Sequence, residues 1–169
     1  MLRIGQGYDI HRFAPGRALV LGGVTISHPV GLLGHSDADV LCHAVADALL
    51  GAMADGDIGV HFPDRDPRWK DADSLDLLRR VAALVKGRGG VVQNVDATLL
   101  AEQPRIASHA AAMRANLGAA LGIPAERISV KATTLEGLGA LGRGEGLAAL
   151  AVALVEAPDA ESGNGGGAP

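Results

Sequence analysis

An acidic and an imidazole side chain stand two positions apart near the start of the sequence, at Asp9 and His11. In an extended segment, residues at i and i+2 point to the same side, so these two side chains would project together. A second imidazole, His43, lies in a stretch whose apolar residues have helical spacing. Two imidazoles and one carboxylate suit zinc and leave its fourth tetrahedral position for substrate or water. The spacing also allows a plainer interpretation, in which Asp9 and His11 are a pair at a strand end and His43 is a solvated helix residue.

Two further segments carry residue types that bind anions. His35 and Ser36 precede the helical stretch, and the N–H groups and dipole at a helix N-terminus favour phosphate. Residues 131–136, KATTLE, and 142–146, GRGEG, place hydroxyls, glycine amides and an arginine beside Glu136. That combination suits phosphate oxygens together with a divalent cation. An ordinary helix cap and a glycine-rich hairpin with solvated charges are the alternatives for the two segments.

Hydrophobic spacing predicts the elements that must position these residues. Strands are expected at residues 2–8, 91–101, 128–134 and 147–155, with a hairpin over 17–26 that turns at Gly22-Gly23. Helices are expected from the N-cap Ser36 to about Met53, from Ser74 to residues 87–90, and from Pro104 to Leu121 with Gly122 as C-cap. The first helix would carry Asp37 and Asp39 in its first turn, with Ser36 and Asp39 as a capping-box-like pair. This mixture predicts an α+β fold, a mixed β-sheet with helices packed on one face.

The composition excludes several classes of protein. With 169 residues, one domain is the default, and the chain can bury a core without disulfides or a structural metal. A net charge of −4 and only four aromatic residues argue against nucleic acid as a partner, and a single cysteine argues against a disulfide framework. The N-terminus lacks a signal-peptide pattern and no apolar run reaches about 20 residues, so we expect a cytoplasmic protein with no membrane partner. Residues 1–157 would form a single catalytic domain, followed by a disordered tail over 158–169.

Seven short motifs follow one another along the chain: GQGYDIH at 5–11, GHSDADV at 34–40, GDIG at 56–59, FPD at 62–64, NVD at 94–96, KATT at 131–134 and GRGEG at 142–146. In this order they resemble the 2-C-methyl-D-erythritol 2,4-cyclodiphosphate synthase family, the ring-closing enzymes of the non-mevalonate isoprenoid pathway. The resemblance covers nearly all of residues 1–157. It implies a phosphorus–oxygen lyase that assembles as a homotrimer, with active sites shared between neighbouring subunits.

The same resemblance implies a reaction and its metals. The substrate would be 4-diphosphocytidyl-2-C-methyl-D-erythritol 2-phosphate, whose 2-phosphate attacks the β-phosphate to give 2-C-methyl-D-erythritol 2,4-cyclodiphosphate and CMP. Asp9, His11 and His43 would hold Zn²⁺, and Glu136 would hold Mg²⁺ or Mn²⁺ with the substrate diphosphate. Attack of one phosphate on another meets like-charge repulsion, which divalent cations relieve, so no protein nucleophile is needed.

Substrate contacts follow from the resemblance as well. His35 and Ser36 would lie by the 2-phosphate, Thr134 would help to stabilise the transition state, and His35 and Thr134 would be the catalytic residues. The methylerythritol part and the phosphates would contact Asp9, His11, Asp57, Ile58, Gly59, Phe62, Pro63, Asp64, Asp66, Glu136 and Arg143. The cytidine pocket, in the adjacent subunit, would be formed by Ala101, Pro104, Arg105, Ile106, Ala107, Ala132, Thr133 and Thr134.

Two other functions stay open at this point. A zinc phosphohydrolase acting on nucleotide diphosphates would use a metal-bound hydroxide, and it would not need a phosphate pocket at His35 and Ser36. A non-catalytic trimeric module with structural zinc would need neither an open coordination position nor Glu136.

Overall fold

The computed structural model describes residues 1–159, and its central element is a mixed five-stranded sheet in the order β4-β1-β7-β5-β6. The strands are β1 (Leu2–Ala14), β4 (Gly31–Leu32), β5 (Val91–Leu100), β6 (Ile128–Thr133) and β7 (Gly146–Glu156). Only β5 and β6 pair in parallel, and the other neighbours are antiparallel. The predicted hairpin forms a separate pair of strands, β2 (Leu19–Leu21) and β3 (Val24–Ile26), and its turn is Gly22-Gly23, where both glycines have positive φ.

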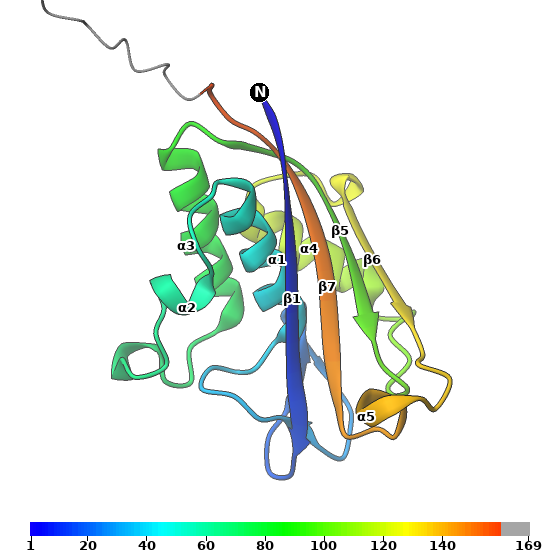
Figure 1. The fold of residues 1–169 in the computed structure, drawn as a ribbon. Helices are drawn as coiled ribbons and strands as arrows, with labels where there is room; N and C mark the ends of the chain where they lie inside the picture. Colours follow the sequence, from blue (N-terminus) through cyan, green and yellow to red (C-terminus); the bar gives the residue numbers. More distant parts are fainter. Residues whose placement is uncertain (160–169) are drawn as a thin grey trace, which may run out of the picture.

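All helices except the short last one, which lies at the end of β7, gather on one side of this sheet (Figure 1). They are α1 (Val40–Ala52), α2 (Ile58–His61), α3 (Ser74–Gly87), α4 (Ala110–Leu121) and α5 (Gly139–Gly142), with short 3-10 turns η1 (Pro67–Trp69) and η2 (Ala125–Arg127). Helix α1 packs against β1 and β7 and is in turn covered by α3. The α+β fold with a mixed sheet and helices on one face is thereby confirmed. No helix within residues 1–159 has the length and apolar character to cross a membrane.

Alternation along β1 decides how closely α1 approaches the sheet. The side of β1 that faces the helices carries Gly5 and Gly7 and then Asp9 and His11. A Cβ at Gly5 would lie 1.8 Å from the carbonyl oxygen of Ala48, and one at Gly7 would lie 1.9 Å from that of Ala44. The backbones of β1 and α1 are therefore in direct contact. Because His43 directly precedes Ala44 in α1, this contact brings His43 beside the next two inward residues of β1, Asp9 and His11.

The other side of the sheet is not covered by a helix within the described residues. Its exposed apolar side chains are Leu2, Ile4, Tyr8 and Ile10 on β1, Val152 on β7 and Val91 on β5. The register of β1 and β7 places Tyr8 opposite Leu150 and Ile4 opposite Leu154. A continuous apolar strip, defined here as Leu2, Ile4, Tyr8, Ile10, Leu150, Val152 and Leu154, therefore runs along the open face of β1 and β7.

The first long helix begins three residues later than the sequence predicts. Asp39, not Ser36, is its N-cap, and the Asp39 carboxylate accepts the N–H groups of Leu41 and Cys42 at 3.1 Å each. The same carboxylate is fully buried and accepts the N–H of Gly23 at 2.7 Å. The predicted capping-box pair and the placement of Asp37 and Asp39 in the first turn are therefore wrong. The tertiary bond to the β2–β3 turn selects Asp39 over the equally suitable Ser36 as the cap.

Two other boundaries differ from the prediction. The helix expected from Pro104 begins only at Ala110, because residues 101–109 form an irregular segment beside β6, although its predicted C-cap, Gly122, is left-handed as expected. Strand β1 continues well past residue 8, because its pairing with β7 extends to Arg12. The strands predicted at 91–101, 128–134 and 147–155 are confirmed to within one or two residues, and the helix predicted from Ser74 to residues 87–90 ends at Gly87. The predicted disordered tail falls, from residue 160 onward, outside the described residues.

Candidate metal centre and substrate cavities

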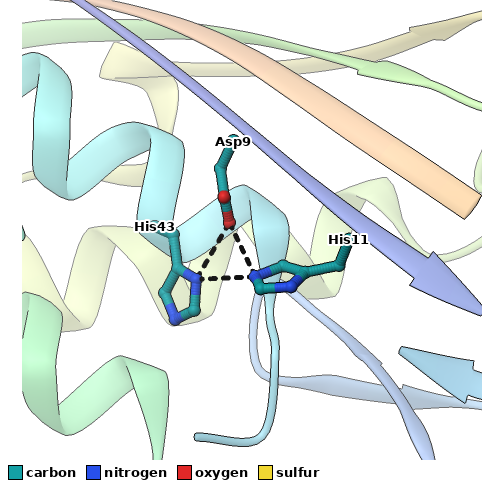
Figure 2. A group of neighbouring side chains, drawn as sticks. All are labelled: Asp9, His11 and His43. Atoms are coloured by element: carbon teal, nitrogen blue, oxygen red, sulfur yellow. Dashed lines mark hydrogen bonds and ion pairs between the residues drawn. The ribbon is translucent and has the colours of Figure 1, made fainter. Parts of the chain in front are cut away.

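Asp9, His11 and His43 converge on one point where β1 passes the start of α1 (Figure 2). Oδ2 of Asp9 lies 2.9 Å from Nδ1 of His43 and 3.0 Å from Nε2 of His11. The two nitrogen atoms lie 3.4 Å from each other. Within residues 1–159, this is the group of histidine, cysteine and acidic side chains whose ligand atoms come close enough to share a metal ion.

The donor set fits a divalent cation. Nδ1 of His11 lies 2.7 Å from the carbonyl oxygen of Leu33. A carbonyl can only accept, so Nδ1 of His11 donates and, in the neutral ring, Nε2 presents its lone pair to the group. A carboxylate oxygen and imidazole nitrogens at this spacing are ligands that zinc and related divalent ions accept. The convergence of Asp9, His11 and His43 that the sequence could only suggest is therefore a possible metal site.

The pKa values of Asp9 and His43 reflect the attraction between the carboxylate and the imidazoles. Burial acts to raise the pKa of Asp9, but the hydrogen bonds and charges of His11 and His43 outweigh it and hold that pKa well below its ordinary value. Burial acts to lower the pKa of His43, but the hydrogen bond and charge of Asp9 outweigh it and raise that pKa. Asp9 thus favours a positive partner at this point, which a proton on His43 or a metal ion supplies.

A cavity of about 300 Å³ opens beside the metal site. The residues that line it besides the metal site come from the loop before α1, from α2, from the segment that follows α2 and from α3: Leu33, Gly34, His35, Ser36, Ile58, Gly59, Phe62, Asp64, Trp69 and Leu77. His35 lines this cavity, and its Nε2 is buried without a hydrogen-bond partner within residues 1–159. The cavity therefore joins a candidate cation site to an imidazole whose polar atom is unsatisfied in the described chain.

The wall formed by α2 is tied directly to α1. Oδ1 of Asp47 accepts the N–H of Ile58 at 2.7 Å, and Asp57 caps α2 by accepting the N–H of Val60 at 3.0 Å. Farther along, Phe62 meets Trp69 edge-on, with ring centroids 5.0 Å apart. These contacts fix the segment that follows α1 where Ile58, Phe62 and Trp69 line the cavity beside the metal site.

A second cavity, of about 630 Å³, lies at the other edge of the sheet. It is lined by residues 101–107, Ala110 and residues 130–134, and it shares no lining residue with the first cavity. Ala101 donates its N–H to the carbonyl of Thr133 at 3.0 Å, which closes the base of this second cavity. Beyond its rim, the hydroxyl of Thr134 donates to Oε1 of Glu136 at 2.9 Å.

Comparison with known proteins identifies the family of this chain. The model of the YgbB family matches residues 2–156. The chain belongs to the YgbB family.

Among the relatives of this YgbB-family chain, a Burkholderia thailandensis protein named 2-C-methyl-D-erythritol 2,4-cyclodiphosphate synthase is 61% identical over 90% of this chain and 94% of its own. A solved structure of the bifunctional IspDF from Campylobacter jejuni is 40% identical with a TM-score of 0.90, covering 94% of this chain. This chain spans only 43% of that longer protein. The Plasmodium falciparum IspF, solved as a CDP complex, is 34% identical with a TM-score of 0.81, over 94% of this chain and 97% of its own.

The site residues expected for this YgbB-family member divide between the two cavities. Around the first cavity lie Asp9, His11, His35, Ser36, His43, Ile58, Gly59, Phe62 and Asp64. Around the second lie Ala101, Pro104, Arg105, Ile106, Ala107, Ala132, Thr133 and Thr134. Asp57, Pro63, Asp66, Glu136 and Arg143 line neither cavity. Of these, Asp66 accepts two hydrogen bonds from the guanidinium of Arg68 on Oδ2, and Arg143 forms an ion pair with Glu145 at 2.8 Å.

Several residues of the site are absent from the sequence-based expectations. Leu33, Gly34, Trp69 and Leu77 line the first cavity, and Ser74 contacts His43. The two leucines look like ordinary core residues in the sequence and Trp69 like an anchor of a polar loop, so no local signal marks them as site residues. Ser74 was assigned only to a helix start, where a serine is common.

Proposed function

We propose that this chain converts 4-diphosphocytidyl-2-C-methyl-D-erythritol 2-phosphate to 2-C-methyl-D-erythritol 2,4-cyclodiphosphate and releases CMP. The observation that carries the proposal is the convergence of Asp9, His11 and His43 beside the cavity that holds His35 and Ser36. Membership of the YgbB family and the shared name of relatives at 60–61% identity support the same activity. The reaction is a step of the non-mevalonate isoprenoid pathway.

The metal site is proposed to hold Zn²⁺ on Asp9, His11 and His43. When bound, such a cation polarises a phosphoryl oxygen and offsets the repulsion between two phosphate groups. A second ion, Mg²⁺ or Mn²⁺, is assigned to Glu136 together with the substrate diphosphate. Glu136 suits this role because its carboxylate is exposed and lies beside the hydroxyl of Thr134, near the rim of the second cavity.

The chain's own contribution is mainly to bind and to orient. His35 and Ser36 are proposed to hold the 2-phosphate, with the unsatisfied imidazole nitrogen of His35 as one of its hydrogen-bond partners. Ile58, Gly59 and Phe62 would enclose the methylerythritol carbons. Because the attacking phosphate belongs to the same molecule, fixing its orientation removes much of the entropic cost of the attack. Enclosure in the cavity also keeps water from competing with the 2-phosphate.

The division of the site between two separate cavities supports active sites shared by neighbouring subunits of a homotrimer. One chain alone presents the metal site at one cavity and the proposed cytidine pocket at the other. The apolar strip on the open face of β1 and β7 is the surface proposed to pack against the other copies. Sedimentation analysis at micromolar concentration should then give the mass of three chains, and a single-chain mass would refute the shared site. The cytoplasmic location stays a prediction.

A phosphorus NMR time course with the cytidine substrate tests the reaction. CMP and the cyclic diphosphate should appear together and in equal amounts when Zn²⁺ and Mg²⁺ are present. Formation of CMP with a linear bisphosphate would show attack by water and would assign the chain to the phosphohydrolases instead. No turnover at all, by protein shown to bind zinc, would favour a non-catalytic module.

A further inference from the structure

Ser74 stands behind the metal site, at the first residue of α3. It is 1% exposed, and its Oγ lies 2.9 Å from Nε2 of His43, the ring nitrogen that faces away from Asp9. The hydroxyl of Ser74 donates a hydrogen bond to Oδ1 of Asp37, and its backbone N–H donates to Oδ2 of Asp37 at 3.1 Å. Both carboxylate oxygens of Asp37 therefore accept hydrogen bonds from Ser74.

The donor and the acceptor of each hydrogen bond between Asp37, Ser74 and His43 follow from their chemistry. An ionised carboxylate only accepts, so the single hydroxyl proton of Ser74 lies on the bond to Asp37. The Ser74 oxygen is then left as an acceptor toward Nε2 of His43, which must carry a proton. In a neutral imidazole only one nitrogen is protonated, so with the proton on Nε2 the lone pair of Nδ1 of His43 is directed at the point between Asp9 and His11, where a cation would accept it.

We propose that Ser74 and Asp37 are positioning residues that fix the tautomer and the ring orientation of His43 for metal binding. The inference rests on the proposed metal site, and it adds two residues that act through His43 and not on the substrate. Partners of this kind raise the basicity of a ligand and remove the cost of reorienting it, so losing one typically costs about 10- to 100-fold in metal affinity.

Backbone hydrogen bonds hold Asp37 and Ser74 in position relative to each other. The N–H of Asp37 donates to the carbonyl of Ala72 at 3.1 Å, and the N–H of Asp71 donates to the carbonyl of His35 at 2.8 Å. These two backbone hydrogen bonds therefore hold the loop that carries His35 against the segment just before α3, next to the Asp37–Ser74 contact. Ser36 Oγ is a more distant neighbour of Nε2 of His43, at 3.2 Å. It also accepts the N–H of Ala38, so Ser74 is the better-placed acceptor.

The test measures the zinc affinity of the full-length protein by competition with a chromophoric chelator at fixed pH. Ser74→Ala should bind zinc roughly 10- to 100-fold more weakly, and Ser74→Thr, which keeps the hydroxyl, should restore most of that affinity. Asp37→Asn has the same shape, but its amide can donate to the Ser74 oxygen and turn the hydroxyl proton toward His43, so its zinc affinity should fall as well. The side-chain ¹⁵N resonances of zinc-loaded wild type should show His43 protonated at Nε2.

Asp73→Ala serves as the matched control. Asp73 caps α3 through the N–H of Leu75 at 2.7 Å but does not touch His43, so its loss should lower the melting temperature and leave zinc affinity unchanged. Wild-type affinity in both Ser74→Ala and Asp37→Asn would overturn the inference. Failure of the wild type to bind zinc would overturn it together with the metal site. A zinc-binding wild type that makes no cyclic product would reject the proposed reaction while the variant series still supports the positioning role.

Discussion

Asp47 and His43 stand one turn apart on the same side of α1, and they are two of the few residues of that helix that are not fully buried. His43 reaches the metal site, and Asp47 accepts the N–H of Ile58 in the cavity wall. One helix face therefore sets both the cation position and the wall opposite it. A shift of the whole helix should therefore move both, whereas loss of the Asp47 side chain should affect only the wall.

Removing the Asp47 carboxylate should loosen the wall without touching the metal. Asp47→Ala leaves the N–H of Ile58 without its partner, and a lost hydrogen bond to a charged acceptor costs about 1.5–3 kcal/mol. We expect KM for the cytidine substrate to rise roughly tenfold or more while zinc affinity stays the same. Asp47→Asn retains an acceptor oxygen and should show a smaller rise. Equal KM values in the wild type and Asp47→Ala would show that the wall does not depend on this bond.

Loss of a metal ligand should abolish turnover without unfolding the chain. His43→Ala should lower bound zinc to a small fraction of one equivalent, measured by elemental analysis after dialysis. Its kcat should fall by roughly 10³-fold or more, because a Lewis acid contributes several kcal/mol to such a reaction. His28→Ala removes an imidazole that lies outside both cavities and should keep its zinc. Full activity of metal-free His43→Ala would refute the ligand assignment.

The two proposed metals should respond to different residues. Glu136 is not part of the Asp9, His11 and His43 group and lines neither cavity. Glu136→Gln should therefore raise the Mg²⁺ concentration needed for half-maximal activity by about tenfold, since it removes a charged oxygen ligand. Its zinc content should equal that of the wild type. A parallel loss of zinc and of magnesium response would argue against two separate sites.

The stability of the zinc-free protein should depend on pH through Asp9 and His43. The pKa of Asp9 is lowered, so its contribution is present above its ordinary value of 3.8 and is lost as pH falls through the lowered pKa. The pKa of His43 is raised, so its contribution is complete below its ordinary value of 6.5 and is lost as pH rises through the raised pKa. Urea unfolding in chelator should show a plateau between these limits. The variant His43→Ala should lack the alkaline decline, and the same decline in both proteins would exclude this ion pair as its cause.

The contact between β1 and α1 should not tolerate a side chain. Gly7→Ala would place a methyl group 1.9 Å from the carbonyl oxygen of Ala44, and the atom it meets is backbone that cannot rotate away. Overpacking of this kind costs about 1–3 kcal/mol or more, so the denaturant midpoint should fall sharply. Gly16→Ala meets nothing within 4 Å and controls for the general effect of removing a glycine, although its positive φ adds a small strain of its own. Equal midpoints for the two variants would mean that α1 can move away from the strand.

Local sequence rules predicted much of the fold, because the long elements carry clear periodicities. The pairing of Asp9 with His11 followed from strand alternation alone. The approach of His43 did not, because it depends on the bare backbone at Gly5 and Gly7, a packing contact between segments far apart in the chain. In retrospect, the alternation of Gly5, Gly7, Asp9 and His11 was a signal that a helix crosses this strand closely.

The errors arose where tertiary contacts decide between equivalent local choices. Ser36 and Asp39 are both good N-caps, and the buried bond from Gly23 selects Asp39. Ser74 reads as an ordinary helix start, yet its hydroxyl faces a residue 31 positions away. Family resemblance supplied many of the residues that line the two cavities, but neither it nor local patterning pointed to the contact between Asp37 and Ser74.

The close backbone contact at Gly5 and Gly7 also affects which amino-acid substitutions this protein can accept during evolution. Where two elements are spaced by side chains, repacking of the core shifts them by fractions of an ångström. Here the spacing between strand and helix is set by main-chain atoms, so aliphatic exchanges elsewhere in the interior would alter stability without moving the three ligands. The relative positions of Asp9, His11 and His43 should therefore change little when other core residues are exchanged. Substitutions at Gly5 or Gly7 are the ones that would move them.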